Sequence, residues 1–146
     1  MKKLITTILI LVAVQGIAQR KTVTVSELRT GNNHLVKAMS INFDTGDTTK
    51  YIYVSFRNSK YKTIVDMESF MLSNAEEYNR FRKDIIFANS EKSTGSSMNW
   101  SRDNYAIMVY DFTNTVYLCS KSLRASTQLY KKDLSKMIDW LNNNEF

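Results

Sequence analysis

Alternation of apolar and polar residues dominates the first half of the chain. A period of two places successive side chains on opposite faces of a strand. This pattern predicts four strands, at residues 21–27, 34–43, 49–56 and about 61–72. Short polar turns separate them, the clearest being Asp-Thr-Gly-Asp at residues 44–47, where Gly46 can supply a positive φ. Sequential strands joined by short turns predict an antiparallel meander.

Two stretches follow the 3.6-residue period of an amphipathic helix instead. The first is predicted to begin at Ser73, where Ser-Asn-Ala-Glu at residues 73–76 matches a capping box, and to end near Asn89. Its buried stripe is predicted to contain Tyr78, Phe81, Ile85 and Ala88. The second covers about residues 131–142, with Trp140 at the edge of the stripe. That stripe is formed by Leu134, Met137, Ile138 and Leu141.

The remaining apolar runs predict strands at residues 105–111 and 115–120 and a short one near 125–129. The order is strands, helix, strands, helix, and no internal repeat is evident. We therefore expect an α+β fold: one antiparallel, meander-like sheet of about six or seven strands with two helices packed on one face. Ile85 and the helical residues Leu134, Ile138 and Leu141 should be buried against strand residues. The strand residues expected there are Ile52, Val54, Val65, Ile107 and Val109.

Residues 1–18 have the pattern of a secretory signal peptide. Lys2 and Lys3 are followed by an apolar run at residues 4–14 and then by Gly-Ile-Ala at residues 16–18. The apolar run is too short for a permanent transmembrane helix, which needs about 20 residues. We expect cleavage before Gln19, export to the periplasm or the medium, and a single globular domain at residues 19–146.

Composition limits the classes of function. Removal of residues 1–18 takes away two of the 20 basic residues, and the remaining basic residues are scattered rather than massed, which does not favour nucleic-acid binding. Cys119 is the only cysteine, so the chain has no internal disulfide. Because it ends the apolar run at residues 116–119, we expect a buried thiol.

The sequence offers few candidates for catalysis. His34 is the only histidine, and no Gly-x-Ser-x-Gly motif accompanies it. Asp66 and Glu68 are expected to share one strand face, but the alternate residues Val65 and Met67 are apolar, so the acids are predicted to lie on the solvated face. A small secreted hydrolase using Asp66/Glu68 or His34 remains an alternative. We predict no catalytic set, no metal site and no cofactor.

A binding role fits the remaining features better. Residues 90–104 are predicted to form a long loop, and such loops are often functional. Aromatic and Arg side chains are common binding anchors, so we select Met98, Trp100 and Arg102 in this loop and Tyr51 and Tyr53 on the predicted sheet. The alternative is that Trp100 packs into the core instead of acting as a binding anchor. The sequence thus predicts a non-enzymatic module that binds a protein or glycan of the bacterial envelope. An inhibitor of a secreted enzyme is a further alternative.

Overall fold

The computed structural model describes residues 20–60, 66–90, 98–110 and 115–146, so the predicted leader lies outside the described residues. The α+β prediction is confirmed. The elements are β1 (Arg20–Thr30), β2 (Asn33–Asn42), β3 (Thr48–Arg57), β4 (Met67–Leu72), α2 (Ala75–Ser90), β5 (Met98–Ser101), β6 (Tyr105–Tyr110), β7 (Thr115–Ser120), β8 (Ser126–Leu129) and α3 (Lys131–Asn143).

The strands form two sheets, not the single sheet of six or seven strands that was expected. Sheet A has the order β1-β2-β3-β4 and sheet B the order β5-β6-β7-β8, and every pairing is antiparallel. The break falls at α2, because the chain leaves β4 through this helix and returns as β5, which pairs with β6. The two sheets meet where the backbone N–H of Ser59 donates to the carbonyl of Ser126 at 2.7 Å.

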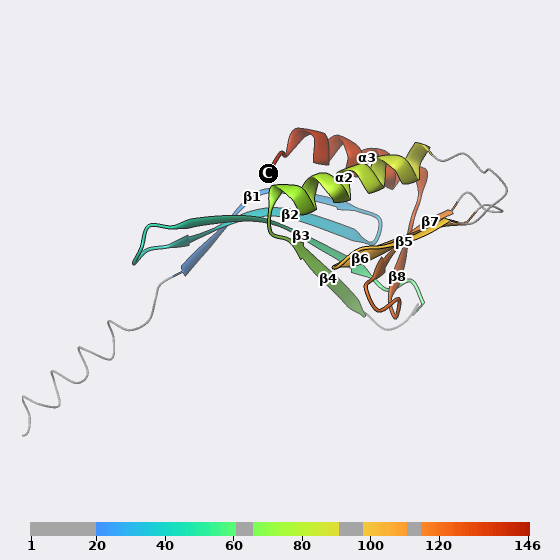
Figure 1. Cartoon of the computed structure of the whole chain (residues 1–146), viewed down its shortest axis with the longest axis horizontal. Coiled ribbons are helices and arrows are strands. Elements are labelled where there is room, and N and C mark those ends of the chain that lie inside the picture. Colours follow the sequence, from blue (N-terminus) through green and yellow to red (C-terminus); the bar gives the residue numbers. More distant parts are fainter. Residues whose placement is uncertain (1–19, 61–65, 91–97, 111–114) are drawn as a thin grey trace, which may run out of the picture.

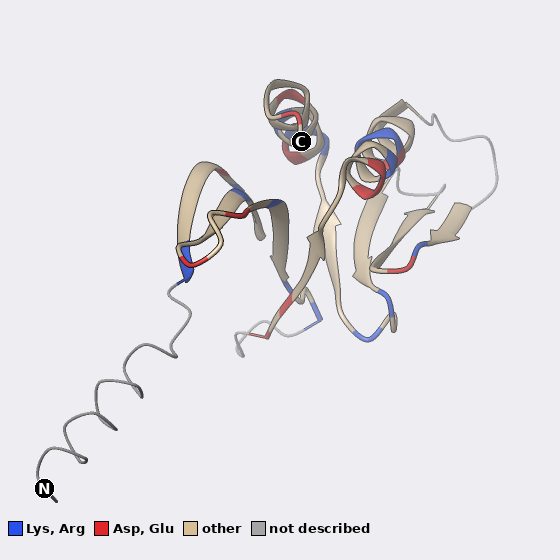
Figure 2. Ribbon diagram, turned by 60° about the vertical axis from the view of Figure 1, so that its left-hand side comes forward, with Lys and Arg blue, Asp and Glu red and all other residues tan. Residues whose placement is uncertain are grey.

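Both helices lie on the same side of the two sheets (Figures 1 and 2). They also contact each other. The Tyr78 hydroxyl on α2 donates to the backbone carbonyl of Leu141 on α3. One turn further along α2, Arg82 Nε donates to Asn142 Oδ1 at 2.7 Å. The prediction that two helices share one face is therefore correct, although that face belongs to two sheets.

The two halves of the chain have the same topology, although no repeat is evident in the sequence. Each half of the chain has four antiparallel strands followed by a helix. Each helix is tied to the sheet of the other half. Helix α3 is anchored on sheet A, where Thr30 donates to Asp133 at 2.6 Å and Trp140 Nε1 donates to Ser26 at 3.0 Å. Helix α2 is anchored to the first hairpin of sheet B through Asp84.

Helix α2 begins one residue later than the predicted capping box. Asn74 Oδ1 accepts a hydrogen bond from the backbone N–H of Glu77 at 2.9 Å. The Glu77 carboxylate in turn accepts from the backbone N–H of Ser73 at 2.7 Å. Asn caps helices as well as Ser does, so both registers were available. Glu76 instead pairs with Arg80 at 2.5 Å.

One continuous core lies between the helices and the sheets. The predicted stripe of α2 is confirmed, because Tyr78, Phe81, Ile85 and Ala88 are all buried. On α3, Leu134, Met137 and Leu141 are buried as predicted, but the stripe is rotated toward Trp140. Trp140, expected at the edge, is buried, whereas Ile138 is only partly buried. The hydrogen bond to Ser26 holds the indole of Trp140 against β1. Of the expected strand partners, Val65 lies outside the described residues. The other four, Ile52, Val54, Ile107 and Val109, are buried.

Candidate functional site

The side of sheet A that faces away from the helices presents large side chains to solvent. On β3, Ile52, Val54 and Phe56 are buried in the core. Because alternate residues of a strand point to opposite faces, Tyr51 and Tyr53 point to the other side. We call this side the outer face of sheet A and define it by Val36, Tyr51, Tyr53, Met67 and Met71. The alternation in the sequence predicted this orientation of both tyrosines.

The strand register places three of these side chains in one row. Tyr53 lies opposite Val36 on β2 and opposite Met71 on β4. Tyr53 is 40% exposed, Met71 46% and Met67 52%. The Tyr53 hydroxyl donates to Ser69 Oγ at 2.6 Å, which fixes the ring over the sheet. Contiguous exposed apolar side chains of this size are typical of interaction sites.

A shallow hollow lies at the β1–β2 turn. Arg29, His34, Arg57 and Met67 are among the residues that line it. Met67 therefore belongs to both the hollow and the outer face of sheet A. Glu27 lies beside the hollow, because its carboxylate is 3.2 Å from His34 Nε2 and 3.7 Å from the guanidinium of Arg29. Arg29, whose side chain is 74% exposed, places a guanidinium where an anionic group of a covering partner can pair with it.

The candidate catalytic residues do not share the expected arrangement. Strand β4 begins at Met67, which is exposed, while Glu68 shares the face of the buried residues Phe70 and Leu72. The prediction that the acids mark the solvated face is therefore wrong for Glu68. Asp66 precedes the strand, so strand alternation does not orient it, and its Oδ2 accepts from Asn58 at 2.9 Å. Glu27 is the acid that contacts His34. Within the described residues, no three His, Cys, Asp or Glu side chains cluster as metal ligands.

Residues 98–101 form strand β5, whereas the sequence predicted that they belong to a loop. Met98 and Trp100 are partly buried against the core, and the Trp100 ring meets Phe87 of α2 edge-on at a centroid distance of 5.4 Å. Arg102 follows the strand and turns toward α2. Trp100 and Arg102 thus contact α2, and Met98 packs against the core on the same hairpin. They lie on the other sheet from Tyr51 and Tyr53, so the five predicted binding residues do not form one site.

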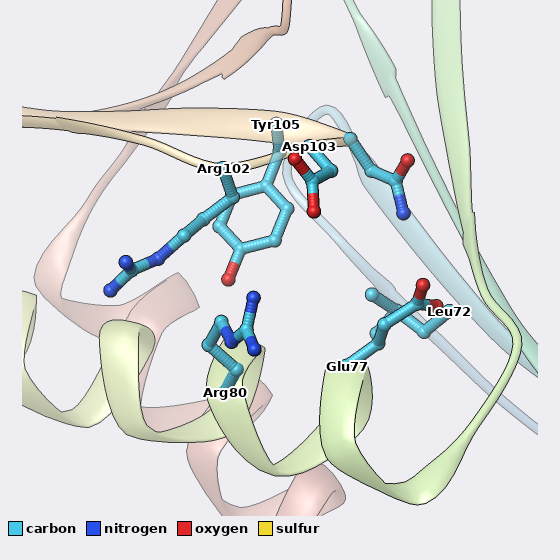
Figure 3. A pocket seen from close by; sticks show the side chains of 7 residues that line it. Leu72, Glu77, Arg80, Arg102, Asp103 and Tyr105 are labelled. Carbon is cyan, nitrogen blue, oxygen red and sulfur yellow. The ribbon is translucent and has the colours of Figure 1, made fainter.

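Arg102 belongs to a half-buried polar cluster that the sequence did not reveal. Its Nε and Nη2 atoms donate to the two oxygens of Asp84, both at 2.8 Å. The Tyr105 hydroxyl donates to Asp84 Oδ2 at 2.7 Å. Figure 3 shows Tyr105 reaching from sheet B toward α2, with its hydroxyl directed at the helix near Arg80. Bidentate, charge-assisted hydrogen bonds of this kind are among the strongest in proteins.

Electrostatics keep the two donors of the cluster, Tyr105 and Arg102, in one protonation state. Burial, reinforced by the hydrogen bond to Asp84, raises the pKa of Tyr105 well above its ordinary value. The hydrogen bond to Asp84 raises the pKa of Arg102 as well. Tyr105 therefore stays protonated and Arg102 stays charged at every physiological pH. A group that does not titrate in this range is suited to holding α2 on sheet B rather than to proton transfer.

Comparison of the chain with protein families, with curated proteins and with solved structures finds no match. The helices of the described residues are too short or too polar to cross a membrane.

Proposed function

We propose that this protein is a small exported module that binds another protein through the outer face of sheet A. The observation that carries the proposal is the exposure of Tyr53, Met67 and Met71 on a face that neither α2 nor α3 covers. Tyr, Met and Arg are the residue types enriched at protein interfaces. The leader at residues 1–18 supports export, and cleavage after it would place the module outside the cytoplasm.

The partner is a protein surface with an apolar patch beside a carboxylate. The row formed by Val36, Tyr53 and Met71 supplies the apolar contact. Arg29, which lies in the adjoining hollow with its side chain 74% exposed, supplies the positive charge. A methionine side chain adapts its shape to an apolar partner, whereas a sugar ring is recognised mainly by hydrogen bonds around an aromatic platform. The two exposed methionines therefore favour a protein over a glycan.

Affinity capture from the native envelope with a Tyr53→Ala variant tests the proposal. Tyr110→Ala is the matched control, because Tyr110 lies on sheet B and is 44% exposed, close to the value for Tyr53. The wild-type protein and Tyr110→Ala should capture the same partner, and Tyr53→Ala should lose about 2 kcal/mol of binding free energy. The proposal would be contradicted if Tyr53→Ala and Met71→Ser both captured the partner as well as the wild-type protein does.

The intact mass of the recovered protein should correspond to a chain that begins at Gln19.

A further inference from the structure

Strand β5 lies at an edge of sheet B, and among the described residues only β6 pairs with it. The backbone N–H of Arg102 donates to the carbonyl of Tyr105 at 2.7 Å, so this pair is hydrogen-bonded. Bonded and non-bonded pairs alternate along an antiparallel ladder. The hydrogen-bonded pairs between β5 and β6 are therefore Trp100 with Ile107 and Met98 with Val109. It follows that the N–H and C=O groups of Asn99 and Ser101 point away from β6.

Two of the four edge strands, β1 and β5, differ in how their edges are protected. Natural proteins discourage unwanted strand pairing at an edge with charged side chains and bulges. Strand β1 has both kinds of protection: its register shifts between Thr24 and Ser26, and it contains Arg20, Lys21, Glu27 and Arg29. Strand β5 reads Met-Asn-Trp-Ser, with no charge and a regular register, so its short length of four residues is the protection that it has.

An apolar surface lies next to this uncharged edge. Phe87 on α2 is 45% exposed although its ring packs against Trp100 of β5. Its neighbour Ile86 is exposed as well. A strand added beside β5 would direct every second side chain to the side of the sheet on which Trp100 and Phe87 lie. The site thus combines main-chain hydrogen-bonding groups with an apolar contact for one or two side chains.

We propose that an extended segment of a partner protein adds to sheet B beside β5. Its backbone pairs with the outward N–H and C=O groups of Asn99 and Ser101, and an apolar side chain of the segment covers Phe87. Main-chain pairing gives such strand addition its affinity, and the side-chain contact gives it specificity. This contact lies on the other sheet from the outer face of sheet A, so it stands independently of the function proposed above.

The test uses the chain from residue 19 to 146, which contains every described element. Twelve-residue peptides are selected against it from a random phage-displayed library, and the peptide bound most tightly is the probe. Asn99→Pro removes the outward N–H without removing a bond to β6, and proline is tolerated at such edge positions. Asn99→Ala is the matched control, since it changes the side chain and keeps the N–H. We expect Asn99→Pro to weaken peptide binding at least about tenfold, and Asn99→Ala to leave it within about threefold.

A spectroscopic measurement keeps the test informative if Asn99→Pro does not fold. In wild-type protein, the peptide should protect the amides of Asn99 and Ser101 from hydrogen exchange. The amides of Met98 and Trp100, already bonded to β6, should change little. Failure to select any peptide, or protection confined to Tyr53 and Met71, would overturn the proposal. So would self-association of the wild-type chain that Asn99→Pro abolishes, because the occupant would then be a second copy.

Discussion

Single residues determine how α3 is held on sheet A. Asp133, in the first turn of α3, accepts a buried hydrogen bond from Thr30 at the end of β1. Gly31, which follows Thr30, has a φ of +55°. It lies so close to Asp133 that a Cβ built on Gly31 would be 3.0 Å from Asp133 Oδ2. Glycine is therefore required at position 31 for two reasons, the left-handed backbone and the close approach of the carboxylate.

Gly31→Ala should lower the free energy of unfolding by more than Gly46→Ala. Both glycines have positive φ, but a Cβ on Gly46 would meet nothing within 4 Å. The backbone penalty, about 1–2 kcal/mol, is common to both variants. The crowding against Asp133 should add about 1–3 kcal/mol in Gly31→Ala only. Urea denaturation of the two variants and the wild type measures the difference. Equal losses would mean that α3 does not depend on this close contact.

Some residue-level features were predictable from the sequence because they depend on local pattern. Cys119 ends an apolar strand, and its predicted burial is confirmed. That burial raises the pKa of its thiol to about 11, which keeps the thiol protonated at neutral pH. The cluster of Asp84, Arg102 and Tyr105 was not predictable, since 18 and 21 residues separate Asp84 from its two donors. No local pattern distinguishes Asp84 from the solvated charges around it.

At the scale of elements, the long periodic segments were predicted best. Both helices and strands β1, β2 and β3 lie close to their predicted positions, because 10 or more residues form each of these elements. Strand β5 was missed because four residues beside a Ser-rich stretch are too short to show alternation. The rotated stripe of α3 has a different cause. Hydrophobicity favours Ile138 for the core, but the hydrogen bond from Trp140 to Ser26 sets the orientation of the helix.

The revised orientation of α3 makes a prediction from two neighbouring truncations. Met137 is fully buried, whereas Ile138 is only partly buried. Met137→Ala should cost about 2–5 kcal/mol of unfolding free energy. Ile138→Ala should cost about 1 kcal/mol, since solvent already reaches this side chain. Thermal or urea unfolding of both variants supplies the comparison. A larger loss of unfolding free energy in Ile138→Ala than in Met137→Ala would mean that Ile138 lies in the core, as the sequence predicted.

For the whole molecule, the hydrogen bonds that tie each helix to the sheet of the other half are the feature that no local pattern predicts, although α2 also packs on sheet A through Phe81 and Phe70. Each meander follows from short turns between neighbouring strands, but the division into two sheets depends on which strand β5 pairs with. That choice is made by long-range packing. The anchoring of α3 on β1 joins residues 103 positions apart, as in the bond from Thr30 to Asp133. The sequence therefore predicted the fold class and not the arrangement of the sheets.

Because each helix is hydrogen-bonded to the sheet of the other half, we expect neither half to be stable alone. A fragment of residues 19–97 retains sheet A and α2 but lacks α3, which covers β1, and lacks Arg102 and Tyr105, which anchor α2. Its apolar inner face would be open to water, so it should be unfolded or aggregated. Circular dichroism and the dispersion of amide signals in NMR spectra check this, with the 19–146 chain as the folded control. A well-dispersed spectrum from the fragment would contradict the interdependence of the halves.

The anchoring of α3 on β1 also has a consequence for the order of events during synthesis. Among the described elements, β1 is synthesised first and α3 last, so β1 obtains its cover only once α3 has been made. Helix α2 can pack on sheet A earlier, through the contact of Phe81 with Phe70, but the part of the sheet around β1 still lacks its helix. An export channel passes an extended polypeptide more easily than a folded one. Completion of the fold only after α3 is made would suit the export that we propose.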